Sequence, residues 1–280
     1  MPRLHVVGCP RSGTTLLMEL LATCFHCQRQ NGHELSIFAP TGVPRSSEQV
    51  FLSKQPTDIL HVGKLLDLDP DLYVVHLLRD PRAVITSRHS GKSGLDYFSN
   101  YRIWKQCELA ARALEGHPHV LHLRYESLVR DPNETQARIA AHFPFLRSRY
   151  SFAEYQDFAH PDPAARAAMN GLRAIDTGSL TKWRQHLPRA KSQLLKFPTM
   201  QWDLEHYGYE PNADWQKLLK DVLPQPHSCR YSDRPQYFKE AEKKLRLWFK
   251  IRRYRRQALS TPVQPRSQSV EELRPRLSEQ

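Results

Sequence analysis

Two stretches of this sequence carry residues that could bind an anion, and the first is residues 8–15, GCPRSGTT. They follow a short apolar run, 3–8, and precede an amphipathic run of helical character, 16–25. A loop in this setting points successive backbone N–H groups and a helix N-terminus at one place, which stabilises an anion. The G-x-x-x-x-G spacing matches a nucleoside-triphosphatase loop, but Thr14 stands where that loop has lysine, and Arg11 supplies the charge instead. We expect an anion site here; the alternative is a tight glycine turn.

The second stretch begins at Arg79, directly after the apolar run 72–78, LYVVHLL. Such a run is typical of a parallel strand covered on both faces, and open α/β sheets bind ligands at the carboxyl ends of their strands. Asp80-Pro81 predicts a helix start, which would place Ser87 two turns into that helix. Arginine offers a fork of donors and serine a hydroxyl, so both could hold one oxyanion. The alternative is a surface ion pair and a helix-facing hydroxyl.

The elements that must position these residues alternate along the chain. Strands predicted at 3–8, 72–78 and 119–125 are separated by helical stretches that include 101–115 and 134–142. This alternation indicates an α/β fold with a parallel sheet and right-handed crossovers. We expect one domain over 1–230 with loops and shorter helices from about 155, a basic helical extension over 231–259, and a disordered tail over 260–280.

Composition excludes several classes of protein. With 40% hydrophobic and 10% aromatic residues, the 280-residue chain can form a packed core, so a disordered protein is excluded. No uncharged apolar run approaches the roughly 18 residues of a membrane span. Five cysteines, an odd number, do not suggest a disulfide framework, and the amino-terminal residues do not read as a secretory signal. These features predict a cytoplasmic protein.

Two anion sites on neighbouring strands suit a ligand with two separated anionic groups, and at this point the residues resemble a family. The chain resembles the sulfotransferases that use 3′-phosphoadenosine 5′-phosphosulfate (PAPS), most of all the tyrosylprotein and bacterial enzymes. Residues 9–17 look like the family's 5′-phosphosulfate loop and 78–87 like its 3′-phosphate motif. Shorter similar segments are 53–56, 124–129, 179–183 and 207–211. The resemblance implies a P-loop NTPase-like three-layer fold with a central parallel sheet.

The resemblance also assigns roles to residues. Those implied to bind PAPS are Arg11, Ser12, Gly13, Thr14, Thr15, Arg79, Ser87, Tyr125, Thr181 and Lys182. The loop and its hydroxyls would hold the 5′-phosphate, Arg79 and Ser87 the 3′-phosphate, and Thr181 and Lys182 would belong to a segment that closes over the cofactor. Arg11 and Lys54 would neutralise charge developing on the bridging oxygen. No metal is expected, since the transferred sulfuryl group carries little net charge.

The acceptor hydroxyl needs a general base. The small-molecule enzymes of the family have a histidine where this chain has Pro56, so the resemblance to tyrosylprotein sulfotransferases assigns the base to Glu34. Glu34 as a solvated loop carboxylate and His33 as the base are the alternatives. Leu16 stands where the cytosolic enzymes have a tryptophan that stacks on adenine, which leaves the adenine contact open. Trp183 is either a core residue or a ligand contact.

Residues 243–256, KKLRLWFKIRRYRR, hold eight basic residues and no acidic one, interleaved with apolar side chains. The favoured interpretation is a helix packed on the domain with a solvated basic face. The alternatives are contact with an anionic membrane surface or a polyanionic substrate, and, as the least expected partner, nucleic acid. Cys24-x-x-Cys27 has metal-ligand spacing, but no second pair follows at that spacing, so core thiols are favoured.

The function that fits best is transfer of a sulfuryl group from PAPS to an acceptor hydroxyl. A carbohydrate acceptor is favoured over a lipid, a small molecule or a protein tyrosine. One rival is a P-loop kinase, which the missing loop lysine and the lack of an evident magnesium-binding aspartate speak against. Another rival is a non-catalytic module that binds anions or membranes through the basic extension.

Overall fold

A five-stranded, all-parallel sheet in the order β2-β3-β1-β4-β5 lies at the centre of the molecule. The computed structural model describes residues 2–29, 34–39, 50–88, 97–225, 227–234 and 237–259, with the side chains of 237–240, 243 and 257–259 outside the description. The strands are β1 (Arg3–Gly8), β2 (Cys27–Arg29), β3 (Val50–Lys54), β4 (Leu72–Leu78) and β5 (Val120–Arg124). The predicted α/β fold with a central parallel sheet is confirmed.

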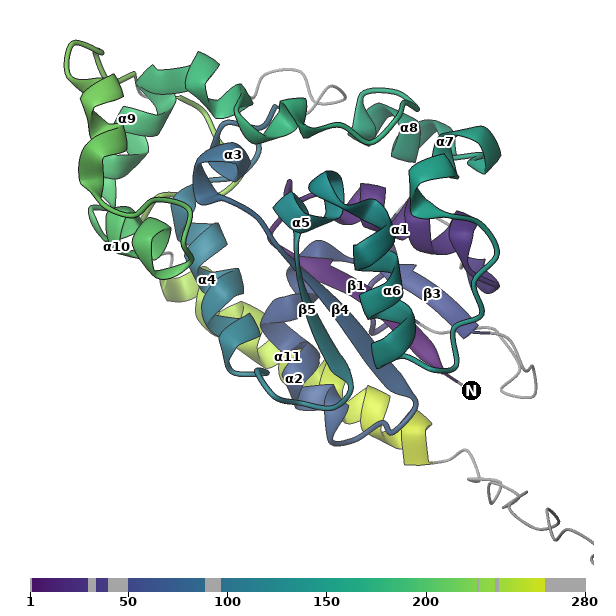
Figure 1. Ribbon diagram of the computed structural model, residues 1–280. Helices are drawn as coiled ribbons and strands as arrows, with labels where there is room; N and C mark the ends of the chain where they lie inside the picture. The colour runs from purple at the N-terminus through teal and green to yellow at the C-terminus, as the bar shows by residue number, and fades with distance from the viewer. Residues whose placement is uncertain are drawn as a thin grey trace, which may run out of the picture.

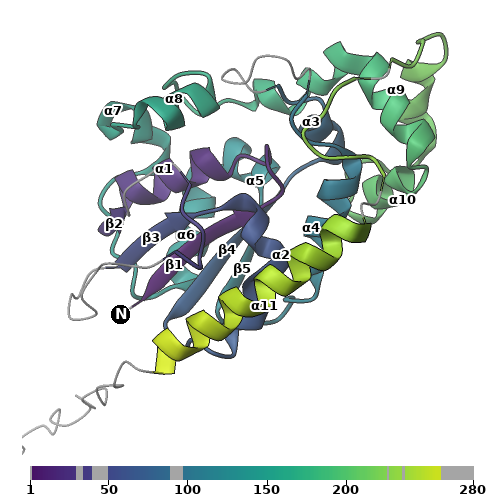
Figure 2. The same cartoon turned by 180° about the vertical axis from the view of Figure 1, so that it is seen from behind.

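Helices cover both faces of the sheet and give the protein three layers. On one face lie α1 (Thr14–Cys24), α5 (Tyr125–Arg130) and α6 (Pro132–His142) (Figure 1). Their apolar side chains pack on those of the strands, with Leu17, Leu20 and Ile139 fully buried. The other face carries α2 (Ile59–Leu66), α4 (Tyr101–Arg112) and α11 (Tyr237–Leu259) (Figure 2). Val62 and Trp104 are fully buried there.

The helix predicted to start at Asp80 is shorter than expected. Asp80 caps α3 (Pro81–Ile85), and its carboxylate accepts from the Arg82 N–H at 2.7 Å. The helix ends at Ile85, and both the N–H and the hydroxyl of the next residue, Thr86, donate to the Arg82 carbonyl, at 3.3 and 2.7 Å. Ser87 therefore lies in the loop after α3, not two turns into a helix.

The remaining elements are short; one follows β3, and the other eight lie after residue 150, in the region where the pattern was predicted to loosen. Nine of them pack around the carboxyl edge of the sheet and its flanks: η1 (Pro56–Asp58), η2 (Phe152–Glu154), α7 (Tyr155–Phe158), α8 (Pro163–Met169), η3 (Thr177–Leu180), η4 (Lys182–His186), α9 (Leu187–Lys196), α10 (Thr199–His206) and η5 (Ala213–Leu219). Strands β2 and β3 were not predicted from sequence. An apolar run of five residues or fewer does not distinguish a strand from other buried structure.

The carboxyl-terminal part of the described chain is joined to the domain. The Asn100 side chain donates to the Tyr231 carbonyl at 2.8 Å, and Lys196 pairs with Asp233 at 2.5 Å. The limits at 230 and 259 stay predictions, and the tail predicted over 260–280 lies outside the described residues. All five cysteines are free thiols. In the described part of the chain, no helix combines the length and apolar character needed to cross a membrane.

Candidate active site

The loop between β1 and α1 forms the floor of the candidate site. Gly13 precedes α1 with φ 102°, and no side chain caps the helix, so its first backbone N–H groups are directed at the space above the loop. Arg11 also has a positive φ, 78°, which is uncommon for a residue with a side chain. This local geometry is what the sequence predicted for an anion-binding loop.

Arg79, at the end of β4, joins two walls of the site. Its Nη1 donates to the Arg11 carbonyl and its Nη2 to the Ser179 carbonyl, both at 3.2 Å. Its guanidinium carbon lies 4.0 Å from the centre of the Tyr125 ring, and the Tyr125 hydroxyl is 2.8 Å from Ser179 Oγ. Arg79 Nε is buried and has no hydrogen-bond partner among the described residues, so this donor is left for a ligand.

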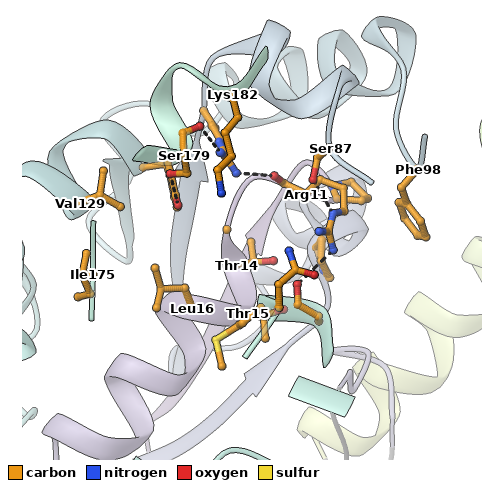
Figure 3. Close-up of a pocket in the computed structure, with 18 of the residues that line it drawn as sticks. Arg11, Thr14, Thr15, Leu16, Ser87, Phe98, Val129, Ile175, Ser179 and Lys182 are labelled. Carbon is orange, nitrogen blue, oxygen red and sulfur yellow. Dashed lines mark hydrogen bonds between the residues drawn. The ribbon is translucent and has the colours of Figure 1, made fainter. Parts of the chain in front are cut away.

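Arg11 lies on the opposite side of the loop beside Ser87 (Figure 3). Its Nε donates to Ser87 Oγ at 3.0 Å, and its Nη2 to the Arg88 carbonyl at 2.8 Å. Burial, together with the nearby charge of Arg79, lowers the pKa of Arg11 to about 10. Arg79 and Ser87, predicted to share one oxyanion, both line the same cavity, but here the Ser87 hydroxyl is bonded to Arg11.

Lys54 is the last residue of β3 and connects the loop with Glu34. Its Nζ donates to Thr15 Oγ1 at 3.0 Å and to Glu34 Oε1 at 3.3 Å. The Lys54 side chain is 1% exposed and that of Glu34 43% exposed. Burial lowers the pKa of Lys54, and the Glu34 carboxylate opposes that shift. A buried cation and a solvent-accessible carboxylate thus meet at one end of the loop. His33, the alternative base, lies outside the described residues.

One cavity of about 440 Å³ joins these groups. Thr14 and Thr15 lie at its base in Figure 3, with Ser179 and Lys182 on one wall and Arg11 and Ser87 on another. Among the described residues, five basic side chains line it, Arg11, Arg79, Arg173, Lys182 and Arg230, against two acidic ones, Glu34 and Asp176. This excess of positive charge suits an anionic ligand.

Nine of the residues selected from sequence line the cavity: Arg11, Gly13, Thr14, Thr15, Glu34, Arg79, Ser87, Tyr125 and Lys182. Lys54 reaches it through Thr15 and Glu34. Ser12 and Thr181 are not among the lining residues: Ser12 belongs to the loop but is only 1% exposed, and Thr181 is exposed between η3 and η4. Their predicted contacts with the cofactor stay predictions.

Sequence reasoning missed much of the cavity wall. Residues 168–171 and 173–176 line it, as do Gln55, Thr57, Phe98 and Arg230. Ile175, Leu16 and Val129 gather in an apolar corner away from Arg11 (Figure 3). Gly171 and Arg173, two positions apart in the sequence, indicate an exposed turn that carries a cation. Nothing in the sequence pattern placed that turn over the loop between β1 and α1.

A buried ionic network holds the segment that carries Arg79. Arg82 pairs with Asp80 at 2.7 Å and also contacts Glu210. The Glu126 carboxylate accepts from the Asp80 N–H at 3.0 Å and from the Tyr209 hydroxyl at 3.3 Å, and burial raises the pKa of Glu126. Residues far apart in sequence, 80–82, 126 and 209–210, therefore fix the end of β4 together, which accounts physically for three of the family-like segments.

Trp183, for which two roles were open, is a core residue. It is 3% exposed and packs edge to face on Trp215, with ring centres 5.8 Å apart. The Arg82 guanidinium lies 4.1 Å from the centre of its ring. Trp183 therefore supports the ionic network; it does not line the cavity described above, but it lines a neighbouring one of about 370 Å³ with Arg79 and Ser87.

Comparison with known proteins points to one family. Residues 33–144 match the family model described as "Sulfotransferase family". This part of the chain is therefore similar to the sulfotransferase family. None of the curated protein sequences matches this chain.

Several solved structures are similar to this chain at low sequence identity. The sulfotransferase domain from the curacin biosynthetic pathway is 16% identical, with a TM-score of 0.51 over 75% of this chain and 99% of that domain. A mouse sulfotransferase complexed with PAP is 14% identical, with a TM-score of 0.47 over 79% and 88%. A sulfotransferase from Alicyclobacillus acidocaldarius is 15% identical, with a TM-score of 0.42 over 77% and 99%. The first of these shows a likeness of fold.

Gly13 offers a test of the loop through stability. A Cβ added there would lie 2.4 Å from Tyr125 Cδ2, in a left-handed backbone conformation. Gly116→Ala is the matched control, because Gly116 has φ 79° and an added Cβ meets nothing within 4 Å. We expect thermal unfolding to show a loss of about 1 kcal/mol for the control and about 3 kcal/mol or more for Gly13→Ala. Equal losses would contradict close packing between the loop and Tyr125.

Proposed function

We propose that this protein transfers the sulfuryl group of PAPS to an acceptor hydroxyl, favouring a carbohydrate acceptor. The observation that carries the proposal is the single cavity that joins the uncapped start of α1, the Lys54–Glu34 pair, and the Arg79 and Ser87 side chains. It contains donors for two separated anionic groups and a carboxylate between solvent and the loop.

The described residues fit PAPS on three counts. The first N–H groups of α1 and the hydroxyls of Thr14 and Thr15 would hold its 5′-phosphate. The unpartnered Nε of Arg79, with the Ser87 hydroxyl, would hold the 3′-phosphate. The apolar corner of Leu16, Val129 and Ile175 suits an adenine ring (Figure 3). Tyr125 would lie beside the nucleoside, and Lys182 would close over it.

PAPS supplies a sulfur atom bonded to a good leaving group, the 5′-phosphate. Glu34 takes the proton of the acceptor hydroxyl, whose oxygen forms its bond to sulfur while the bond from sulfur to the bridging oxygen breaks. Lys54 and Arg11 stabilise the negative charge that develops on that oxygen. The products are the sulfated acceptor and adenosine 3′,5′-bisphosphate (PAP), and the Glu34 proton is released to solvent.

Four residues of the cavity wall support a sugar as the acceptor. Gln55 and Thr57 offer hydrogen-bonding side chains, while Phe98 and Tyr231 offer flat ring faces. A few polar groups among apolar surfaces fix the orientation of a small ligand in this way. Transfer of sulfur-35 from labelled PAPS to a panel of glycans, lipids, small alcohols and tyrosine peptides tests the choice. Label on the lipids or peptides alone would overturn the carbohydrate preference.

Nucleotide binding tests the proposal directly. We expect calorimetry to show PAP binding at least a hundredfold tighter than ATP, unchanged by a magnesium chelator, because the loop has Thr14 where a kinase has lysine. Tighter binding of ATP that required magnesium would favour the P-loop kinase instead.

We also propose the cytoplasm as the location, since a reducing compartment suits five free thiols.

A further inference from the structure

Helix α11 is held against the domain by one of its faces. Tyr254 is 7% exposed, donates to Asp69 at 2.6 Å and packs edge to face on Phe38, with ring centres 6.2 Å apart. Ile251, one turn earlier, packs against the same core. Figure 2 shows the helix lying along the surface of the layer that contains α2. Tyr254 and Ile251 therefore mark the face of α11 that packs on the domain.

The opposite face of α11 exposes large apolar side chains to solvent. Leu245 is 59% exposed, Trp248 52% and Phe249 58%. At 100° per residue, these three lie about 120–180° around the helix from Tyr254. The rings of Trp248 and Phe249 are in contact, with centres 5.0 Å apart. Three neighbouring exposed apolar side chains form a patch that the packing of the domain does not explain.

Cations surround this patch. Of the described side chains between 241 and 256, seven are basic and one, Glu242, is acidic. Glu242 is already paired with Arg246 at 2.5 Å. Arg252 and Arg256 lie about 160–200° from Tyr254, on the same face as the apolar patch, and the Arg252 guanidinium lies 5.2 Å from the Trp248 ring centre. The outer face of α11 is therefore both apolar and strongly basic.

We propose that the outer face of α11, defined by Leu245, Trp248, Phe249, Arg252 and Arg256, docks on an anionic membrane surface. A second copy of this chain is a poor occupant, because each copy carries a formal charge of +12 and would bring the same basic helix. A soluble polyanion would pair with the arginines but leave the aromatic rings in water. The bilayer interface takes both, with rings at the headgroup level and guanidinium groups on anionic lipids. The inference goes beyond the proposed function and is independent of it.

Sedimentation of the full chain with vesicles tests the proposal. One set of vesicles is phosphatidylcholine alone, and the other contains about one third phosphatidylserine. We expect binding to the anionic vesicles, at least tenfold weaker binding to the neutral ones, and a loss of affinity as salt rises. The double variant Trp248→Ser, Phe249→Ser is expected to bind anionic vesicles at least tenfold more weakly, as is Arg252→Gln, Arg256→Gln.

Trp202→Ser is the matched control, since Trp202 on α10 is also 52% exposed but lies outside this face. It is expected to bind anionic vesicles as the parent chain does, and thermal unfolding midpoints show that each variant is folded. Unchanged binding by the aromatic double variant would overturn the proposal. A second result would also overturn the proposal: no vesicle binding, together with tight binding of a soluble sulfated glycan by both the parent chain and the aromatic double variant. That result would assign the face to a polyanion.

Discussion

Glu34→Gln is expected to lower kcat by about a hundredfold to ten-thousandfold while leaving PAP affinity at neutral pH within a few-fold. The amide keeps the size of the side chain and its hydrogen bond with Lys54, 3.3 Å long, but no longer accepts the acceptor's proton. Single-turnover transfer of sulfur-35 from PAPS, together with PAP calorimetry, measures the two quantities separately. Glu154→Gln, an exposed carboxylate that does not line the cavity, is the control and is expected to be unchanged.

The rival base and the structural alternative give different results. If His33 were the base, His33→Asn would abolish turnover and Glu34→Gln would leave it intact. If Glu34 only neutralised Lys54, its variant would show a defect mainly at alkaline pH: the Glu34 carboxylate raises the pKa of Lys54 against burial, so removing it lowers that pKa further. Lys54 would then lose its proton at a lower pH, and the site would lose part of its positive charge with it. A defect of the same size from neutral to alkaline pH indicates proton transfer by Glu34.

The second large effect is expected from Arg79→Met, which should lower PAP affinity by about a hundredfold or more. Each hydrogen bond between a charged donor and a phosphate contributes about 1.5–3 kcal/mol, and the Arg79 fork can make two. Adenosine 5′-phosphate lacks the 3′-phosphate, so its affinity is expected to fall by less than about tenfold. Calorimetry gives the ratio of the affinity for PAP to that for adenosine 5′-phosphate, and this ratio should approach one in the variant.

Two outcomes would contradict this assignment. If both nucleotides lost affinity equally, Arg79 would act by holding the loop and the 177–180 segment through the carbonyls of Arg11 and Ser179, not by binding the 3′-phosphate. If neither lost affinity, the 3′-phosphate would lie elsewhere in the cavity, near Arg173 or Arg230. Arg138→Met, an exposed arginine on α6 outside the cavity, is expected to change neither affinity and controls for net charge.

The sequence by itself determined the parts of this protein that depend on near neighbours. Strands β1 and β4, the glycine loop before α1 and the Asp80 cap were all predicted, because apolar runs, glycine conformation and helix capping act over a few residues. That Arg79 and the loop would share one edge also followed, since parallel strands end on the same side of a sheet.

Only the tertiary structure decided which side chains meet across that edge. The hydrogen bond of Lys54 with Thr15, the bond between Arg11 and Ser87, and the wall formed by 168–179 join residues 39, 76 and about 160 positions apart. Sequence pattern predicts faces and ends of elements, but the path of a loop is set by packing against distant residues. The same holds for α11: its charge was evident in the sequence, while the burial of Tyr254 decided which of its apolar side chains face solvent.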